Sequence, residues 1–142
     1  GYGLYLKMLE DTLATLSGDD KQEKKTVDIK LAISAYISDD YIHEDRVRLE
    51  LYRRLSKASE IQEVYAIEEE MEDRFGKPDV PTKQFIELII IKILALNLGI
   101  QSISSYEMAI TFTKANDTKE TIKSPSKDDD DIIATTLRYL RK

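Results

Sequence analysis

Carboxylates are the side chains of this chain whose number and spacing could most readily do chemistry. Residues 67–76 read IEEEMEDRFG, and the wider segment from Glu60 to Gly76 contains seven acidic residues and one arginine. Its net charge of −6 equals the net charge of the whole 142-residue chain. Such a cluster could activate a reactant, bind a cation, dock onto a basic partner, or form the solvated face of a helix.

A second acidic run, Asp128 to Asp131, could in principle supply oxygen ligands to Mg²⁺. Consecutive carboxylates on a helix point in different directions, however, and the spacing of an EF-hand is absent. Paired catalytic carboxylates need two different environments, and both clusters are predicted to be exposed. Helix capping and solvation therefore explain this run better. We expect no catalytic residue, metal ion or cofactor, and a carboxylate metal-binding enzyme domain is the less favoured alternative.

Motifs for other chemistry are missing from the sequence. The five glycines form neither GxxxxGK[ST] nor GxGxxG, and the single histidine, His43, lacks a serine or second histidine at triad or metal spacing. The absence of cysteine suits a reducing cytoplasm. A pI near 4.9 argues against general affinity for nucleic acid. The longest apolar run is too short and too interrupted to cross a membrane. A cytoplasmic, protein-binding role is the expectation.

Hydrophobic periodicity predicts the elements that would position these residues. Leucines at three- and four-residue spacing predict a helix over Tyr2–Leu16, and strict alternation predicts a half-buried strand over Thr26–Ile37. Helical patterns follow within residues 43–59 and from a Ser59 N-cap onward. A nearly all-apolar helix is predicted between a Thr82 cap and Gly99.

The last third of the chain has a different pattern. Residues 101–113 and 119–124 predict short strands around a turn at residues 114–118. Residues 128–142 carry acids at the start and bases at the end, which suits a final helix and its macrodipole. The sum predicts a helix-rich, single-domain α+β fold with a small mixed or antiparallel sheet that includes the first strand.

Helical geometry divides the acidic segment into two faces. Glu68 lies at the edge of the predicted buried face. That face consists of Val64, Ile67, Met71 and Phe75. The opposite, solvent-facing flank consists of Glu63, Ala66, Glu70 and Asp73. From the residues alone this flank is either a solvated face or a docking patch for a basic partner.

The preceding helix carries a cationic stripe. Its members are Arg46, Arg53, Arg54 and Lys57. Glu50 falls within the same arc, so a surface with ion pairs from Glu50 to Arg53 and Arg54 is favoured over a phosphate site. Arg48 projects toward the apolar face instead, and we expect it to form a structural ion pair with Glu68.

Four blocks of sequence within residues 1–99 resemble a known family. They read GYGLYLKMLEDTL, ISAYISDDYI, RVRLELYRRL and EEMEDRFGKP, in this order. In their order and spacing they are similar to the C-terminal domain of bacterial transcription-repair coupling factors. The resemblance implies that residues 1–142 form a single C-terminal regulatory domain, a fragment of a larger multidomain protein.

The resemblance also implies a function for the parent protein. Members of the family are ATP-driven DNA translocases that bind stalled RNA polymerase and recruit the repair protein UvrA. Their motor domains, which use ATP and Mg²⁺, would lie outside this chain, which would not itself be an enzyme. The C-terminal domain would pack against the parent's UvrA-binding module and mask it until RNA polymerase and DNA are engaged.

The resemblance further implies which residues make the masking contact. Acids just before the DRFG turn face arginines of the UvrA-binding module in the family, and these acids correspond to Glu70 and Asp73. Glu63 and Ala66 would extend the patch. An alternative is an independent acidic adaptor that binds an external basic protein or RNA polymerase itself.

Overall fold

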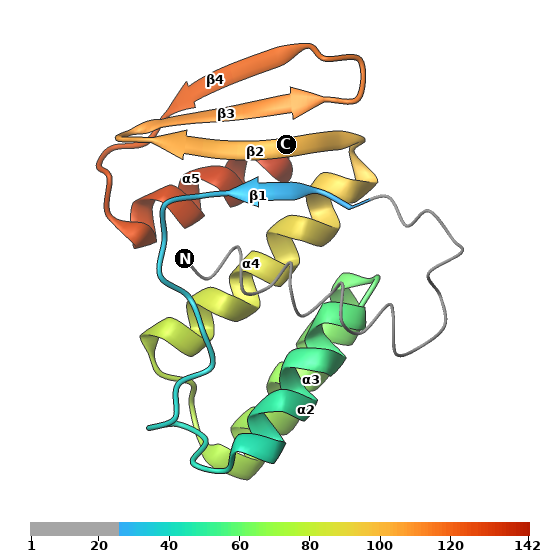
Figure 1. The fold of residues 1–142 in the computed structure, drawn as a ribbon, viewed down its shortest axis with the longest axis vertical. Coiled ribbons are helices and arrows are strands. Elements are labelled where there is room, and N and C mark those ends of the chain that lie inside the picture. Colours follow the sequence, from blue (N-terminus) through green and yellow to red (C-terminus); the bar gives the residue numbers. More distant parts are fainter. Residues whose placement is uncertain (1–25) are drawn as a thin grey trace.

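The computed structural model describes residues 26–142, so the helix predicted over Tyr2–Leu16 lies outside the described residues. Helices and strands share one α+β fold, as predicted (Figure 1). In chain order the elements are β1 (Asp28–Lys30), α2 (Asp45–Lys57), α3 (Ile61–Phe75), α4 (Val80–Asn97), β2 (Ile100–Tyr106), β3 (Ala109–Lys114), β4 (Lys119–Lys123) and α5 (Asp129–Leu140).

The strands form one mixed sheet in the order β1-β2-β3-β4. β1 runs parallel to β2, and the other two pairs are antiparallel hairpins. Ile103, Ile110 and Phe112 are fully buried on the face toward α4 and α5, where Phe112 stacks on Tyr139 of α5 at 3.9 Å between ring centroids. Figure 1 shows α4 and α5 on the same side of the sheet. The opposite face is left open by the described elements.

The strand predicted over Thr26–Ile37 is wrong in extent, because only Asp28–Lys30 pairs with β2. Beyond Lys30 the Ile33 and Tyr36 N–H groups donate to the carbonyls of Leu31 and Pro81, and four other backbone N–H groups bond to side chains of other elements. Ala32, Ser34, Ile37 and Ser38 donate respectively to Ser105 Oγ (2.8 Å), Asp129 Oδ2 (3.1 Å), Tyr52 Oη (2.6 Å) and Thr82 Oγ1 (3.1 Å). The alternation did predict burial, since Ile33, Ala35 and Ile37 are buried. Side chains, together with the carbonyls of Leu31 and Pro81, have replaced the strand ladder as acceptors.

Two helix starts also differ from the prediction. α3 has Glu60 rather than Ser59 as its N-cap residue. α4 begins after Asp79, whose carboxylate accepts the Thr82 N–H at 3.3 Å, with Pro81 in the first turn. Proline suits this position because the first N–H groups of a helix have no intrahelical partner. Thr82 is not the cap: it is fully buried, and its hydroxyl accepts a hydrogen bond from the Ser38 N–H.

α4 is the central element of the fold. It lies between the α2–α3 pair and the sheet, and it packs against α5 as well (Figure 1). Ten of its residues are buried, which fits the nearly all-apolar sequence and explains why this helix lacks a polar stripe. Among residues 26–142, no helix is long and apolar enough to cross a membrane.

Candidate functional site

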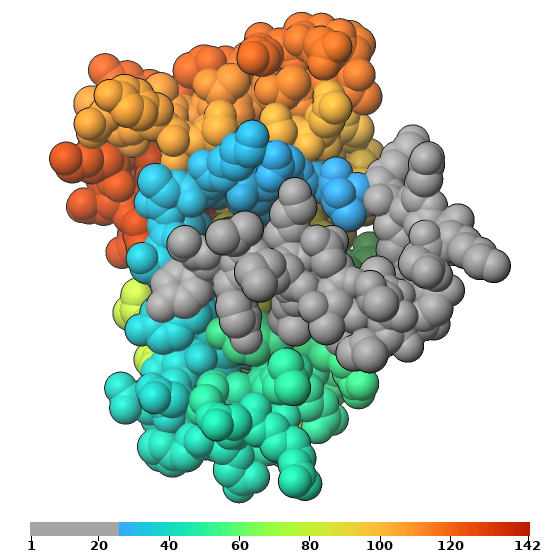
Figure 2. Space-filling view, viewed as in Figure 1, coloured from blue at the N-terminus to red at the C-terminus, as the bar shows by residue number. Residues whose placement is uncertain are grey.

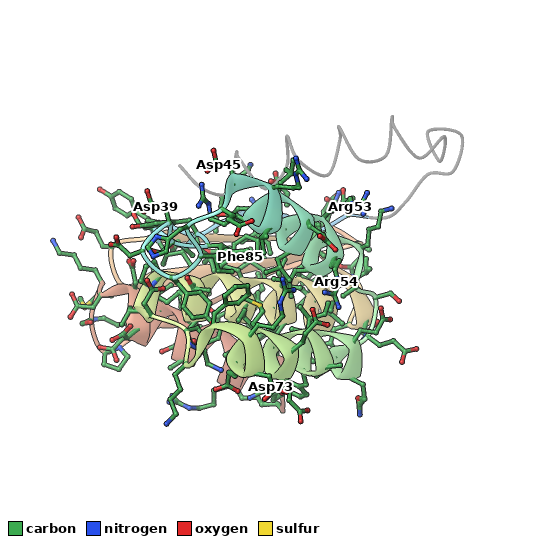
Figure 3. All side chains as sticks on the ribbon, turned by 90° about the horizontal axis from the view of Figure 1, so that it is seen from below. Asp39, Asp45, Arg53, Arg54, Asp73 and Phe85 are labelled. Atoms are coloured by element: carbon green, nitrogen blue, oxygen red, sulfur yellow. The ribbon has the colours of Figure 1, made fainter. Side chains whose placement is uncertain are left out.

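The acidic face of α3 is the candidate site. Val64, Ile67 and Met71 turn into the core, as the helical geometry predicts. Their burial fixes the rotation of the helix and thereby the direction of its acids. Of the predicted flank, Glu63, Ala66 and Asp73 are exposed, whereas Glu70 is half-buried. In Figure 3 Asp73 lies on the outer side of α3, and Arg54 lies between α2 and α3.

Glu70 is held by two arginines. Arg54 of α2 donates to both carboxylate oxygens, at 2.6 and 2.9 Å, and Arg74 of α3 donates to one of them at 3.3 Å. The hydrogen bonds from Arg54 are the main reason that the pKa of Glu70 falls to about 2, against a smaller opposing effect of desolvation. Glu70 is therefore not the free acid that the sequence predicted, and Arg54 bonds across to α3 instead of pairing with Glu50.

Asp73 differs from Glu70 in this respect. Within residues 26–142 it makes no ion pair or side-chain hydrogen bond. Glu63 accepts a single hydrogen bond from the Ser59 hydroxyl at 3.2 Å. The uncompensated negative charge of the flank thus lies at Asp73 and Glu63, at the two ends of a stripe with Ala66 between them.

The predicted ion pair between Arg48 and Glu68 is wrong. Arg48 donates to the carbonyl of Ile42 at 2.6 Å and pairs with Asp45 one turn earlier in its own helix. Glu68 pairs instead with Lys83 of α4 at 2.6 Å. The reason is proximity: Asp45 satisfies Arg48 locally, and α4 presents Lys83 to the edge of α3 on which Glu68 lies.

The predictions from the sequence did not include Tyr41, which holds the C-terminal end of α3. Its hydroxyl donates to the carbonyl of Gly76 at 2.6 Å, with the Met71 carbonyl at 3.2 Å, and its ring meets Phe75 edge to face at 5.9 Å. Burial, and then the nearby charge of Glu72, raises the pKa of Tyr41 to about 12. Gly76 ends the helix at a φ of 87°, which favours glycine. The end of α3 that carries Asp73 is therefore fixed from outside the helix.

The second acidic cluster serves the fold. Asp129 accepts the Ser34 N–H, Asp130 accepts the Gln84 amide at 2.9 Å, and Asp131 accepts the Ser126 hydroxyl at 2.6 Å, so the three carboxylates point to three separate donors. Over the part of the chain that the structure describes, no three histidine, cysteine or acidic residues form a group suited to a metal ion.

Comparison with known families shows the family of the chain. A family model described as TRCF domain matches residues 31–124, which include α2, α3, α4 and the three strands β2, β3 and β4. The chain belongs to the TRCF domain family. The matched range contains all four residues of the predicted flank and both arginines that hold Glu70, Arg54 and Arg74.

Named relatives agree with this family. The chain is 48% identical over 140 residues to a transcription-repair-coupling factor of Helicobacter pylori, covering 99% of this chain and 14% of that protein. It is 30% identical over 102 residues to one of Staphylococcus haemolyticus, covering 70% of this chain and 9% of that protein. The chain therefore spans about a seventh or less of the length of these relatives.

A solved structure supports the fold of this TRCF domain. The crystal structure of the C-terminal domain of a transcription-repair coupling factor superposes with a TM-score of 0.59 at 22% sequence identity. The match covers 64% of this chain and 58% of that one. At this identity the likeness concerns the arrangement of helices and strands.

Proposed function

We propose that this TRCF domain is the C-terminal regulatory domain of a bacterial, cytoplasmic transcription-repair coupling factor. It acts without catalysis, by packing against the parent's UvrA-binding module and masking it until RNA polymerase and DNA are engaged. ATP and Mg²⁺ would be used by motor domains elsewhere in the parent. The observation that carries the proposal is the exposed charge of Asp73 and Glu63, which no described residue compensates, on a helix whose position is fixed by its buried face.

Such a surface suits a contact that must open. Exposed pairs between arginine and a carboxylate contribute only about 0–1 kcal/mol each. A few of them give a coupling of about 1–3 kcal/mol between closed and open states, which is the usual scale of a regulatory switch. Arginine is the expected partner residue because its planar guanidinium binds a carboxylate with defined orientation.

The ion pairs within the domain determine which acids of the flank are available to a partner. Both oxygens of Glu70 already accept hydrogen bonds from Arg54, so a partner arginine must share or displace that guanidinium. Asp73 has no such competitor among the described residues. Asp73 is therefore proposed as the leading contact, Glu63 and Ala66 as its extension, and Glu70 as a secondary contact.

The test is Asp73→Arg in the full-length parent protein. Reversal of this charge removes the attraction to a basic partner, so affinity for UvrA and the rate of ATP hydrolysis should both rise. Asp39→Arg is the matched control, because Asp39 is an exposed acid in the loop before α2, away from α3 (Figure 3). UvrA affinity that is the same in the two variants would remove Asp73 from the masking contact.

A second measurement separates masking from an external adaptor role. The 142-residue chain is tested for binding to the parent's isolated UvrA-binding module and, separately, to RNA polymerase. Masking predicts binding to the module that weakens as salt is added, since exposed charges are screened beyond about 8–10 Å at physiological ionic strength. Binding to polymerase alone would support the adaptor instead.

A further inference from the structure

The sheet has a free edge at β4. β4 pairs with β3 on one side and is the last strand in the order β1-β2-β3-β4. Figure 1 shows no described element beyond it, and Figure 2 shows the β3–β4 hairpin at the upper end of the molecule, opposite α2. An open edge presents unpaired backbone donors and acceptors that another strand can use.

The register identifies the backbone groups at this edge. The hairpin is closed by the Lys114 N–H donating to the Thr118 carbonyl at 2.8 Å, and at its other end the Ser124 N–H donates to the Met108 carbonyl at 2.7 Å. Residues of an antiparallel pair alternate between facing the partner strand and facing away. Glu120 and Ile122 therefore point their backbone groups at β3. Lys119, Thr121 and Lys123 point theirs outward.

The side chains of the same three residues form one row on the open face of the sheet. Thr121 lies beside Thr111, with the two hydroxyls 2.9 Å apart. Glu120 lies on the other face, where it accepts a hydrogen bond from the Tyr139 hydroxyl at 2.7 Å. Lys119 and Lys123 are exposed, and neither forms an ion pair with a described residue. The edge is thus positive in a chain whose net charge is −6.

A hollow adjoins one end of this edge. In the register Tyr106 pairs with Ala109, which pairs with Lys123, so the small alanine lies between a tyrosine ring and a lysine stem. The open space here is about 410 Å³ and also borders Glu107, Met108, Thr121 and Ile122. Tyr106 is 79% exposed, which is unusual for a large ring. The hollow can accept one apolar side chain.

We propose that the β4 edge binds an extended acidic peptide segment as a fifth strand, with carboxylates at Lys119 and Lys123 and an apolar side chain beside Thr121, which borders the hollow. Main-chain hydrogen bonds to the three outward residues would supply affinity, and the lysines and the hollow would supply selectivity. This binding is separate from the acidic face of α3 and does not depend on the function proposed for it.

The lysines disfavour a second copy of this chain as the occupant. If two β4 strands paired antiparallel about Thr121, Lys119 of one copy would face Lys123 of the other, and like charges directly opposite are destabilising. A strand with acids at those positions has the opposite preference. Single-stranded nucleic acid is less suited, because Tyr106 is the only aromatic ring on the described open face and stacking on successive rings normally supports such binding.

The experiment uses a fluorescent peptide with the sequence Thr-Glu-Val-Leu-Val-Glu-Thr and the 142-residue chain. Spaced in this way, the two glutamates lie opposite the two lysines, with leucine beside Thr121. Anisotropy should give a Kd of about 0.1 mM, with NMR amide shifts centred on β4. A peptide with lysine in place of both glutamates should not bind measurably.

Two variants and one control locate the contact. Thr121→Pro removes an outward N–H without removing a bond to β3, and K119E/K123E reverses the edge charge; each should weaken binding by about tenfold or more. R53E/K57E makes the same charge change on exposed residues of α2 and should leave binding unchanged. Circular dichroism verifies folding. K119E/K123E alters only exposed side chains, so it decides the result if Thr121→Pro unfolds.

Three outcomes would overturn the proposal. One is no binding at about 1 mM peptide. Another is binding that K119E/K123E leaves unchanged, or amide shifts that avoid β4. The third is an oligothymidylate that displaces the peptide and binds more tightly, which would assign the face to nucleic acid.

Discussion

The two ends of the molecule carry charge in different ways. On α3 the half-buried acid Glu70 is paired with Arg54, and Glu68 is paired with Lys83. On β4 the exposed bases Lys119 and Lys123 have no acidic partner among the described residues, and the backbone beside them faces outward. Both ends are exposed, yet only at the sheet end are side chains and backbone available together.

This difference shows that a partner can pair only with charged side chains that have no ion pair within the domain. The acidic segment Glu60–Gly76 has a net charge of −6 by composition, but two of its acids, Glu70 and Glu68, are paired with Arg54 and Lys83 of neighbouring helices. On the predicted flank, Asp73 and Glu63 have no ion pair with any described residue. Internal ion pairs also fix the geometry of α2 against α3, so they prepare the surface although they remove charge from it.

Paired proline substitutions give the largest expected effect and test the free edge. Ile122→Pro removes an N–H that faces β3 and should lower the free energy of unfolding by about 3 kcal/mol or more. Thr121→Pro removes an outward N–H and should cost less than about 1 kcal/mol, because proline is tolerated on the open side of an edge strand. Urea denaturation followed by circular dichroism measures both. Equal costs would mean that the outward groups of β4 are already paired.

Two charge reversals on one helix test the difference between Glu70 and Asp73. Glu70→Lys places a cation between Arg54 and Arg74 and should destabilise the domain by about 1–2 kcal/mol. Asp73→Lys makes the same change where no described residue is paired and should shift stability by no more than about 0.5 kcal/mol. The free energies come from urea denaturation at neutral pH. A large cost for Asp73→Lys would show that Asp73 has a structural role.

Acid titration tests the Arg54–Glu70 pair directly. Arg54 lowers the pKa of Glu70 from 4.5 to about 2. Because the folded pKa is the lower one, the stabilisation is present above pH 4.5 and is lost as the pH falls toward 2. For a pair this exposed it amounts to less than about 1 kcal/mol. Carboxyl ¹³C NMR should show Glu70 titrating near 2, and Arg54→Gln should raise that midpoint.

The smallest effect compares a paired lysine with an unpaired one. Lys83→Met removes the ion pair with Glu68 and should cost about 0.5 kcal/mol, while Lys123→Met should change stability by only a few tenths. Thermal and urea unfolding of the two variants provide the comparison. A greater loss for Lys123→Met would reveal an internal partner at the sheet end.

Much of the fold could be predicted from periodicity. The 3.6-residue pattern places Val64, Ile67 and Met71 in the core and the flank of α3 outside it, because one turn of helix fixes both directions at once. A different signal, the helix macrodipole, predicts α5 from acids at its start and Arg138 near its end. Alternation in residues 26–37 predicts burial correctly, since side chains of an extended chain point alternately to two sides.

Partners across elements could not be predicted in this way. Whether an extended segment becomes a strand depends on a neighbour at hydrogen-bonding distance, and residues 32–38 have Ser105, Asp129, Tyr52 and Thr82 as acceptors instead. An ion pair likewise depends on which helices lie side by side. Arg54 had an acid in its own helix, but the packing of α2 on α3 offered it both oxygens of Glu70.

The sequence by itself determined which residues of α3 face outward, the α+β class and the resemblance to the TRCF family, because these depend on order and spacing along one chain. Only the tertiary structure decided that Glu70 forms ion pairs and Asp73 does not, among the described residues, that Glu68 pairs with Lys83, and that β4 is an open edge. Electrostatic and hydrogen-bond partners are chosen by distance in space, and sequence spacing fixes that distance only within a single helix or hairpin.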